Sequence, residues 1–401
     1  MNRVYPLHSI GFGVSLLLCG QFAYAHGEVE TQIGTQVSAA VSATWRDDGM
    51  LLQDGRWQIP GVLMGGEAYP VEEGTTVDEA RISVQHRTAD GVFGMLQVSS
   101  HDGVSDAEIH HAYGGVEFDT GPMFITVSAG RMAAAMTPAN GEHSSDRLFS
   151  ETPLPMDAFL GRQLNDDGVR LTLSAGPFQL GLESWQGDGF PANGAGDESG
   201  DVYLHYLERW HALALHAGMW WLQADAEDRA DTRYTASGHS HGSITSDAPE
   251  YWFDGRTEIS GVFIRLNGDF SRNWQWSVEA QYFQVDIDGV IWDNTRQVQW
   301  IADNNGGWLQ ASVGYGDHQV GVRWERLALA NNITGAAAHN MAELTGLYNL
   351  KHDPERTGLL YRWQLRPDFA LRFEAIEDAI QSDSVQRFAL GMIWSVDLIA
   401  L

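Results

Sequence analysis

The chain has 401 residues and a formal net charge of -29, because 53 acidic residues outnumber 24 basic ones. This excess of carboxylate argues against nucleic acid as a partner, since phosphate binding depends on clustered Lys and Arg, and it favours cations as the attracted species. With 43% hydrophobic residues, 44 Gly and 15 Trp, the chain is too aromatic and too rich in Gly for disorder and too polar for a bundle of membrane helices.

The first residues have the order of a secretory signal. A basic start at Arg3 precedes an apolar core near 14–18 and the small residues of Ala23-Tyr24-Ala25. We therefore expect a signal peptide over 1–25 and a mature chain over 26–401. An alternative is acylation of Cys19, although Leu18 rather than a small residue precedes it. Beyond the signal, no segment offers the roughly 18 uncharged apolar residues that a membrane helix needs.

Alternation of polar and apolar residues with a period of two runs through the rest of the chain. It is clearest from Trp274 to Phe283, where Trp274, Trp276, Val278, Ala280 and Tyr282 share one face and Gln275, Ser277, Glu279 and Gln281 share the other. The pattern predicts strands near 32–46, 79–88, 91–100, 108–119, 122–131, 167–175, 178–187, 201–209, 212–223, 256–267, 273–286, 307–316, 318–327, 356–364, 368–377 and 386–398. A soluble β-sandwich also alternates in this way, so the connections must decide.

The expected connections are alternately short and long. Turn residues mark short connections at 88–91, 119–122, 175–177, 268–269, 316–317 and 366–368, whereas long polar insertions occupy 47–78, 132–166, 188–200, 224–255, 287–306 and 328–355. Such long insertions do not suit a compact sandwich, but a membrane barrel has short periplasmic turns and long external loops. We therefore predict an all-β fold: a transmembrane antiparallel barrel of about sixteen strands in a bacterial outer membrane.

A barrel of this size encloses a wide polar lumen, and the loop at 132–166 is where general porins, by resemblance, fold a constriction. Acidic and basic groups on opposite sides of a narrow pore produce a strong transverse field. The alternative is that the loop stays outside, with its charges in water. The candidate constriction residues are Glu142, His143, Asp146, Glu151 and Asp157 on the loop and Arg81, Arg87, Arg170, Arg323 and Arg372 on the wall.

Several of the 15 histidines are clustered. In the loop at 224–255, His239 and His241 lie near Asp247, and His with carboxylate suits zinc and similar divalent metals, although these can also be ordinary polar loop residues. His110 and His111 form a further candidate cluster. Because adjacent residues on a regular strand point to opposite faces, we expect only one of these two to reach the lumen.

One segment resembles a known family. The run from Arg147 to Gly161, with Pro-Leu-Pro and Phe-Leu-Gly, and the following Asn165-Asp166-Asp167-Gly168 are similar to a family of zinc-associated outer-membrane proteins. The likeness extends to Gly187–Pro191 and Glu279–Phe283 and covers about the central half of the chain. Members are often labelled TonB-dependent receptors, which implies a plug domain before the barrel. Here the first expected strand begins within about ten residues of His26, which leaves no room for a plug and favours a porin.

We predict a porin-like channel for passive diffusion of small polar solutes, with a preference for cations and a link to uptake of zinc or another divalent metal. The alternative is a plug-less surface-binding or structural barrel whose external loops bind a partner or metal. No enzyme signature of the Gly-x-Ser-x-Gly, His-Glu-x-x-His or phosphate-loop type was found, so neither catalysis nor a required cofactor is expected.

The expected partners are outer-membrane lipid, lipopolysaccharide, and small polar solutes or cations. The acidic loops have a second interpretation, in which they only keep the surface soluble and bind divalent ions beside lipopolysaccharide. Porins of this size are often trimers, and the short loop at 101–107 is placed to contact a neighbour in a homotrimer.

Overall fold

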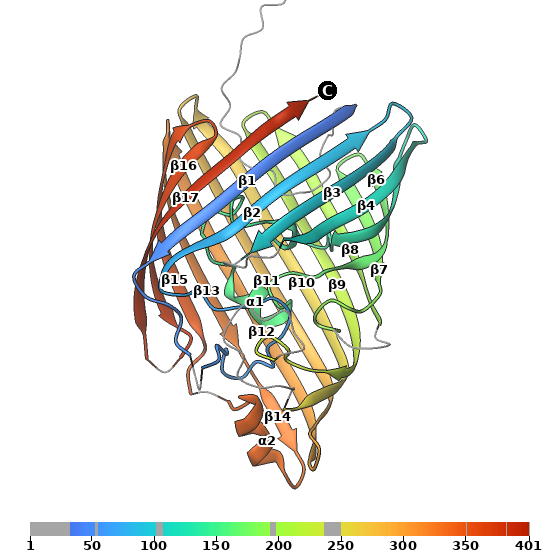
Figure 1. The fold of residues 1–401 in the computed structure, drawn as a ribbon. Coiled ribbons are helices and arrows are strands. Elements are labelled where there is room, and N and C mark those ends of the chain that lie inside the picture. Colours follow the sequence, from blue (N-terminus) through green and yellow to red (C-terminus); the bar gives the residue numbers. More distant parts are fainter. Residues whose placement is uncertain are drawn as a thin grey trace, which may run out of the picture.

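The protein is a closed antiparallel β-barrel (Figure 1), described here from a computed structural model over residues 33–52, 55–101, 107–192, 198–235, 250–349, 351–381 and 383–400. The sheet contains seventeen strands, of which β14 (Asn331–Thr334) pairs with β12 only, so sixteen form the wall. Pairing of β1 with both β17 and β2 closes the barrel. The wall strands are β1 Gly34–Arg46, β2 Gly74–Arg87, β3 Val92–His101, β4 Glu108–Asp119, β5 Phe124–Ala133, β6 Asn165–Ala175, β7 Phe178–Trp185, β8 Glu198–Trp210, β9 Leu213–Arg229, β10 Trp252–Ser271, β11 Trp274–Trp292, β12 Gln297–Tyr315, β13 His318–Ala328, β15 Glu355–Arg366, β16 Phe369–Ala379 and β17 Val385–Ala400.

All sixteen expected strands are present, and their connections alternate between short and longer ones except between β11 and β12. Short connections gather at one end of the barrel, the turn end, near the C-terminus in Figure 1. Longer ones gather at the opposite end, the loop end, which carries β14 and α2 (Ala338–Thr345). Among the described residues, no helix is long and apolar enough to cross a membrane. The expected signal peptide over 1–25 lies outside the described residues.

Two expected connections were wrong. The segment 287–306 is not a long loop: β11 continues to Trp292, β12 begins at Gln297, and only 293–296 connect them. The turn expected at Gly268-Asp269 falls at 272–273, because β10 runs on to Ser271.

The reversal of side-chain polarity along β11 explains the first error. Up to Tyr282, apolar side chains face outward and polar ones such as Glu279 face the lumen. Beyond this point Asp286 and Asp288 face outward, while Phe283 and its inward neighbours are buried. The nine residues from Trp274 to Tyr282 match the length of a tilted strand that crosses a membrane. The strand therefore leaves the lipid near Tyr282 and continues as an ordinary soluble hairpin.

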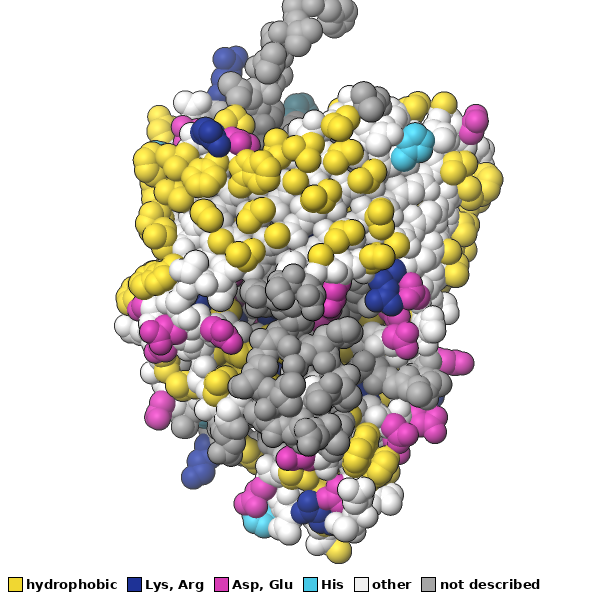
Figure 2. Space-filling model, viewed as in Figure 1, with side chains coloured by type: hydrophobic (Ala, Val, Ile, Leu, Met, Phe, Trp, Pro, Cys, Tyr) yellow, Lys and Arg dark blue, Asp and Glu magenta, His cyan; other side chains and the backbone are white. Residues whose placement is uncertain are grey.

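An apolar band surrounds the half of the barrel toward the turn end (Figure 2). Its side chains are large and exposed, including Ile82, Leu96, Val262, Leu309 and Phe388. The lumen-facing strand neighbours of these residues include the buried polar residues Ser83, Gln97 and Arg387. Acidic side chains lie on the surface beyond this band, toward the loop end (Figure 2). An apolar outer face around a polar lumen is the arrangement of a barrel that spans lipid.

A hydrophobic core fills the barrel at the loop end. The connection before β2 contributes Trp57 and Ile59, and the connection between β5 and β6 contributes Leu154 and Phe159 from around its short helix α1 (Leu154–Phe159). These side chains pack against inward residues of the extended strands, among them Trp220, Leu222, Phe283, Val285, Trp308 and Leu327. Two connections thus fold back into the barrel because their apolar residues are buried there.

Candidate functional site

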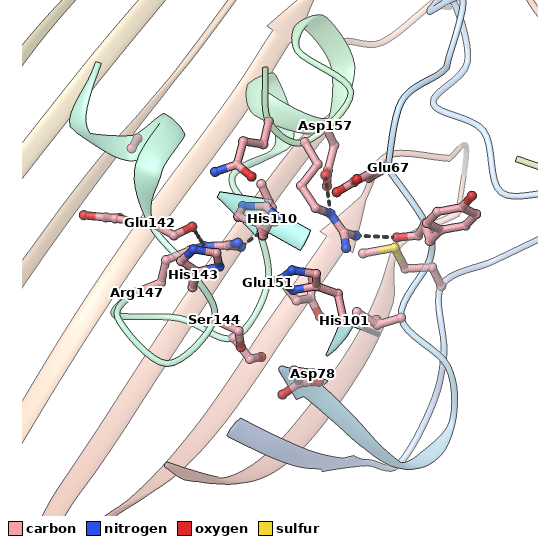
Figure 3. A pocket seen from close by; sticks show the side chains of 18 of the residues that line it. Glu67, Asp78, His101, His110, Glu142, His143, Ser144, Arg147, Glu151 and Asp157 are labelled. Atoms are coloured by element: carbon pink, nitrogen blue, oxygen red, sulfur yellow. Dashed lines mark hydrogen bonds and ion pairs between the residues drawn. The ribbon is translucent and has the colours of Figure 1, made fainter. Parts of the chain in front are cut away.

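The connection over 134–164, named here the inner loop, lies inside the barrel. It contains η1 (Pro138–Gly141) and α1, and its polar residues His143, Glu151 and Asp157 are each 3% exposed. Figure 3 shows these side chains gathered with Glu67 and Asp78 around one pocket. The five loop residues proposed as a constriction therefore lie among lumen-facing wall residues rather than in water outside.

Direct ion pairs join the inner loop to the wall. Asp146 pairs with Arg81 at 2.7 Å, and Glu142 pairs with Arg265 at 2.8 Å. The carboxylate of Glu151 lies 2.5 Å from Arg387 and 3.4 Å from Arg356. Asp157 instead faces Arg162 of the same loop, at 3.5 Å. The loop carboxylates are therefore in contact with arginines, rather than facing them across an open gap.

Of the wall arginines predicted from the sequence, Arg81 alone pairs with a loop carboxylate within the described residues. The others pair with glutamates of the wall itself: Arg87 with Glu117, Arg170 with Glu183, Arg323 with Glu325, and Arg372 with Glu374. Their part in a pore constriction remains a prediction.

These wall pairs also satisfy the backbone of the buried loop. Four wall glutamates accept loop N–H groups: Glu79 from Ser145 at 2.9 Å, Glu183 from Ala135 at 3.0 Å, Glu325 from Leu154, and Glu374 from Ser150 at 2.7 Å. Three wall arginines donate to loop carbonyls: Arg323 to Glu151, Arg356 to Thr152, and Arg372 to Ser144. Arg170 donates to the carbonyl of Ala133, at the end of β5 just before the loop. A buried backbone group without a partner is costly, and bonds to charged partners are strong. The wall is thus complementary to this loop conformation.

Sequence reasoning missed the wall glutamates, yet a local signal was present. Arg323 and Glu325, and likewise Arg372 and Glu374, stand two positions apart and so share the lumen face. Glu79 and Arg81 form a third such pair, at 3.1 Å. Opposite charges at this spacing on the polar face indicate a lumen lined with ion pairs.

Burial and neighbouring charges shift the pKa values of the loop carboxyls. Burial raises the pKa of Glu142 to about 7, against the attraction of Arg265. Burial likewise raises the pKa of Asp157 to about 6, against Arg162. For Glu151 the burial effect is outweighed by Arg387 and Arg356, which lower its pKa to about 2. Glu151 is therefore the firmly ionised group of the three at neutral pH.

Three histidines meet at the edge of the inner loop (Figure 3). His101 ends β3, His110 lies on β4 and His143 lies on the loop, and one ring nitrogen of each lies within 4.8 Å of those of the other two. The expectation that only one of His110 and His111 reaches the lumen was wrong. The pairing of β3 with β4 shifts register at this point, and both imidazoles are buried, with ring centres 4.6 Å apart. A β-bulge re-aims side chains in this way.

The cavity beside these histidines measures about 50 Å³. Two further cavities measure about 20 and 10 Å³. A water needs about 10–15 Å³, so the cavity beside the histidines holds a few waters and no larger solute. His143 borders this cavity, and burial, with the nearby charge of Arg81, lowers its pKa well below the ordinary value. The predicted external metal ligands His239, His241 and Asp247 lie outside the described residues.

Comparison with solved structures finds outer-membrane barrels of low sequence identity. A loop-deletion mutant of OmpT, an outer-membrane protein of Vibrio cholerae, matches with a TM-score of 0.54 and 14% identity over 90% of this chain and 99% of that one. OprB of Pseudomonas putida matches with a TM-score of 0.52 and 10% identity, over 90% and 94% of the two chains. The outer-membrane channel DcaP of Acinetobacter baumannii matches with a TM-score of 0.52 and 12% identity, over 90% and 96%. No family model and no curated protein matches the chain. These matches show the fold, a large antiparallel barrel of the outer-membrane type, and the apolar outer band agrees with a barrel that spans lipid.

Proposed function

We propose that the protein is a narrow porin-like channel that lets small polar solutes cross the outer membrane by passive diffusion and prefers cations. The observation that carries the proposal is a closed sixteen-stranded wall whose lumen face is lined with charged and polar side chains. A similar fold is described as a channel in Acinetobacter baumannii, which supports transport rather than catalysis.

The charge balance supports the preference for cations. The chain carries 53 acidic residues against 24 basic ones, and acidic side chains lie at the loop end on the face that Figure 2 shows. A mouth lined by one sign of charge raises the local concentration of the opposite ion. We further propose that His239, His241 and Asp247 hold zinc weakly at the external surface, beside lipopolysaccharide, and that this links the channel to uptake of divalent metal. Weak binding suits transport, because ions must leave as well as enter.

A homotrimer is part of the same proposal. One form of the similar Vibrio cholerae protein is described as a trimer. The short loop proposed as a contact, 101–107, lies almost wholly outside the described residues.

Planar-bilayer conductance of the refolded protein tests the proposal, with reversal potentials measured in a salt gradient and the measurement repeated with zinc and then a chelator. We expect a small, steady, cation-selective current. An anion-selective current would contradict the preference for cations, and an absence of current from folded protein would contradict the channel.

A second candidate, a barrel closed by its own loops that acts as a surface-binding protein, is favoured by one observation. The hydrophobic core at the loop end includes residues of two connections and of the facing wall, and the cavity beside the three histidines measures only about 50 Å³. This candidate predicts no conductance under any voltage or salt condition, so the same recording separates the two.

A further inference from the structure

We propose that His101, His110 and His143 form a binding site for one transition-metal ion of the zinc class inside the barrel. The proposal concerns metal binding by the folded protein and holds whether or not the barrel conducts. It also differs in place from the proposed external zinc ligands, because two of its residues lie on β3 and β4 and the third on the inner loop.

The geometry brings three imidazoles together from three separate segments. The ring centres of His110 and His143 lie 4.8 Å apart, those of His101 and His110 lie 5.1 Å apart, and those of His101 and His143 lie 5.6 Å apart. One nitrogen from each ring lies within 4.8 Å of the other two. Two nitrogens bound to a tetrahedral zinc at about 2.0–2.1 Å lie about 3.4 Å apart. Ring rotations that move each nitrogen by about 1 Å would therefore let all three bind one ion.

The Nε2 atom of His110 points to a ligand. The residue is 7% exposed, and this nitrogen is buried without a hydrogen-bond partner among the described residues. A buried polar atom left in this state is costly and calls for an explanation. A metal ion bound by all three rings would supply the missing partner.

Polar side chains surround the three imidazole rings, in the position of the residues that contact metal-binding histidines in metal proteins. The Ser99 hydroxyl lies 2.8 Å from Nε2 of His101, where it can accept a ring N–H. The side-chain amide nitrogen of Gln97 lies 2.9 Å from Nε2 of His143 and donates to it, so it must turn aside if this nitrogen binds the ion. The Glu79 carboxylate lies 3.6 Å from Nδ1 of His143 and 3.1 Å from Arg81, so it offsets the positive charge next to the cluster. Acceptors such as the Ser99 hydroxyl and the Glu79 carboxylate orient metal-ligating histidines and strengthen their bonds to the ion.

The ligand set selects the class of ion. Three neutral imidazoles suit Zn²⁺, Co²⁺, Ni²⁺ or Cu²⁺, whereas Ca²⁺ and Mg²⁺ require oxygen ligands. All three histidines line the cavity of about 50 Å³, which has room for a water as the fourth ligand. A bound ion would join β3, β4 and the inner loop and so stabilise the loop in its buried position.

Titration of the refolded full-length barrel with Zn²⁺ in a calorimeter, and with Co²⁺ followed by visible absorption, tests the site. We expect one ion per chain and no competition from Mg²⁺ or Ca²⁺. His110→Ala and His101→Ala should each weaken binding by more than the 10–100-fold that loss of an outer-shell partner costs. His143→Gln should do the same, and because it lies on the loop it serves where a wall variant fails to fold.

Two matched controls locate the ion. His216→Ala removes a half-buried histidine of the wall outside the cluster, and the double variant His239→Ala/His241→Ala removes the external loop histidines. Unchanged affinity in both controls, together with a higher unfolding temperature in zinc for the wild type but not for His143→Gln, supports the site. Binding that disappears with His239 and His241, that survives loss of the cluster, or that is absent from the wild type overturns it.

Discussion

Replacing Glu151 by Gln should release part of the inner loop from the wall. The carboxylate is 3% exposed and contacts two buried guanidinium groups, Arg387 at 2.5 and 3.0 Å and Arg356 at 3.4 Å. Depression of its pKa from 4.5 to about 2 corresponds to about 3 kcal/mol of preference for the ionised form in the folded protein. Loss of one partner of a buried ion pair costs about 3–5 kcal/mol, which agrees.

The sign of the pH dependence follows from the lowered pKa. The contribution of Glu151 is fully present above its unfolded pKa near 4.5 and is lost as pH falls through the folded value of about 2. At pH 7 the Glu151→Gln variant should therefore be about 3 kcal/mol less stable than the wild type, and the difference should shrink on acidification.

Guanidinium unfolding in lipid vesicles measures this difference, and single-channel recording shows whether loosening of the loop increases the current. Glu72→Gln is the control, since it removes the same charge from an exposed position on another connection. A Glu151→Gln variant as stable as Glu72→Gln at pH 7, or a stability gap that persists at pH 2, would refute the argument.

Three further predictions rest on single contacts. Burial raises the pKa of Asp157 from 3.8 to about 6 in the folded protein, so the wild type should lose about 3 kcal/mol of stability as pH rises from about 4 to 6. The Asp157→Asn variant should not show this loss. Guanidinium unfolding from pH 4 to 8 measures both proteins, and the same pH profile in both would contradict the prediction. Gly358→Val should destabilise by about 1–3 kcal/mol, since a Cβ there lies 2.8 Å from Phe149 of the inner loop; stability equal to wild type would show that the loop is not packed there. Phe283→Ala should cost about 3–5 kcal/mol and its neighbour Tyr282→Ala much less, because the first side chain is fully buried and the second is 45% exposed; equal losses of unfolding free energy would exclude the proposed membrane boundary.

The wall was predictable because its signal is local. Within a strand, residues two apart share a face, so alternation alone locates sixteen segments, including the one from Trp274 to Tyr282. The same rule failed past Tyr282, where the outside changes from lipid to water and polarity reverses. The expectation of apolar residues on the outer face therefore ends β11 too early, although the strand continues to Trp292.

The contacts of the site were less predictable because they are not local. Glu151 and Arg387 are 236 positions apart, and closure of the whole barrel decides that they meet. The position of Glu151 in the lumen could be expected from the loop, but its partner could not. His110 was assigned to a regular strand, and only the observed register shows the bulge that turns it beside His111.

Different forces hold the two halves of the inner loop. Its second half, over 154–164, packs into the hydrophobic core through Leu154, Phe159 and Leu164, so removing it would expose a large apolar surface to water. The first half, over 142–151, is held by ion pairs and borders the cavity, where water can replace a broken contact. Water that enters from the cavity can solvate the separated charges and so offset the cost of breaking these ion pairs, whereas it cannot offset the exposure of apolar side chains. We therefore expect the first half to move at the lower cost. A pore that opens without unfolding must therefore open along 142–151, the segment that also carries His143.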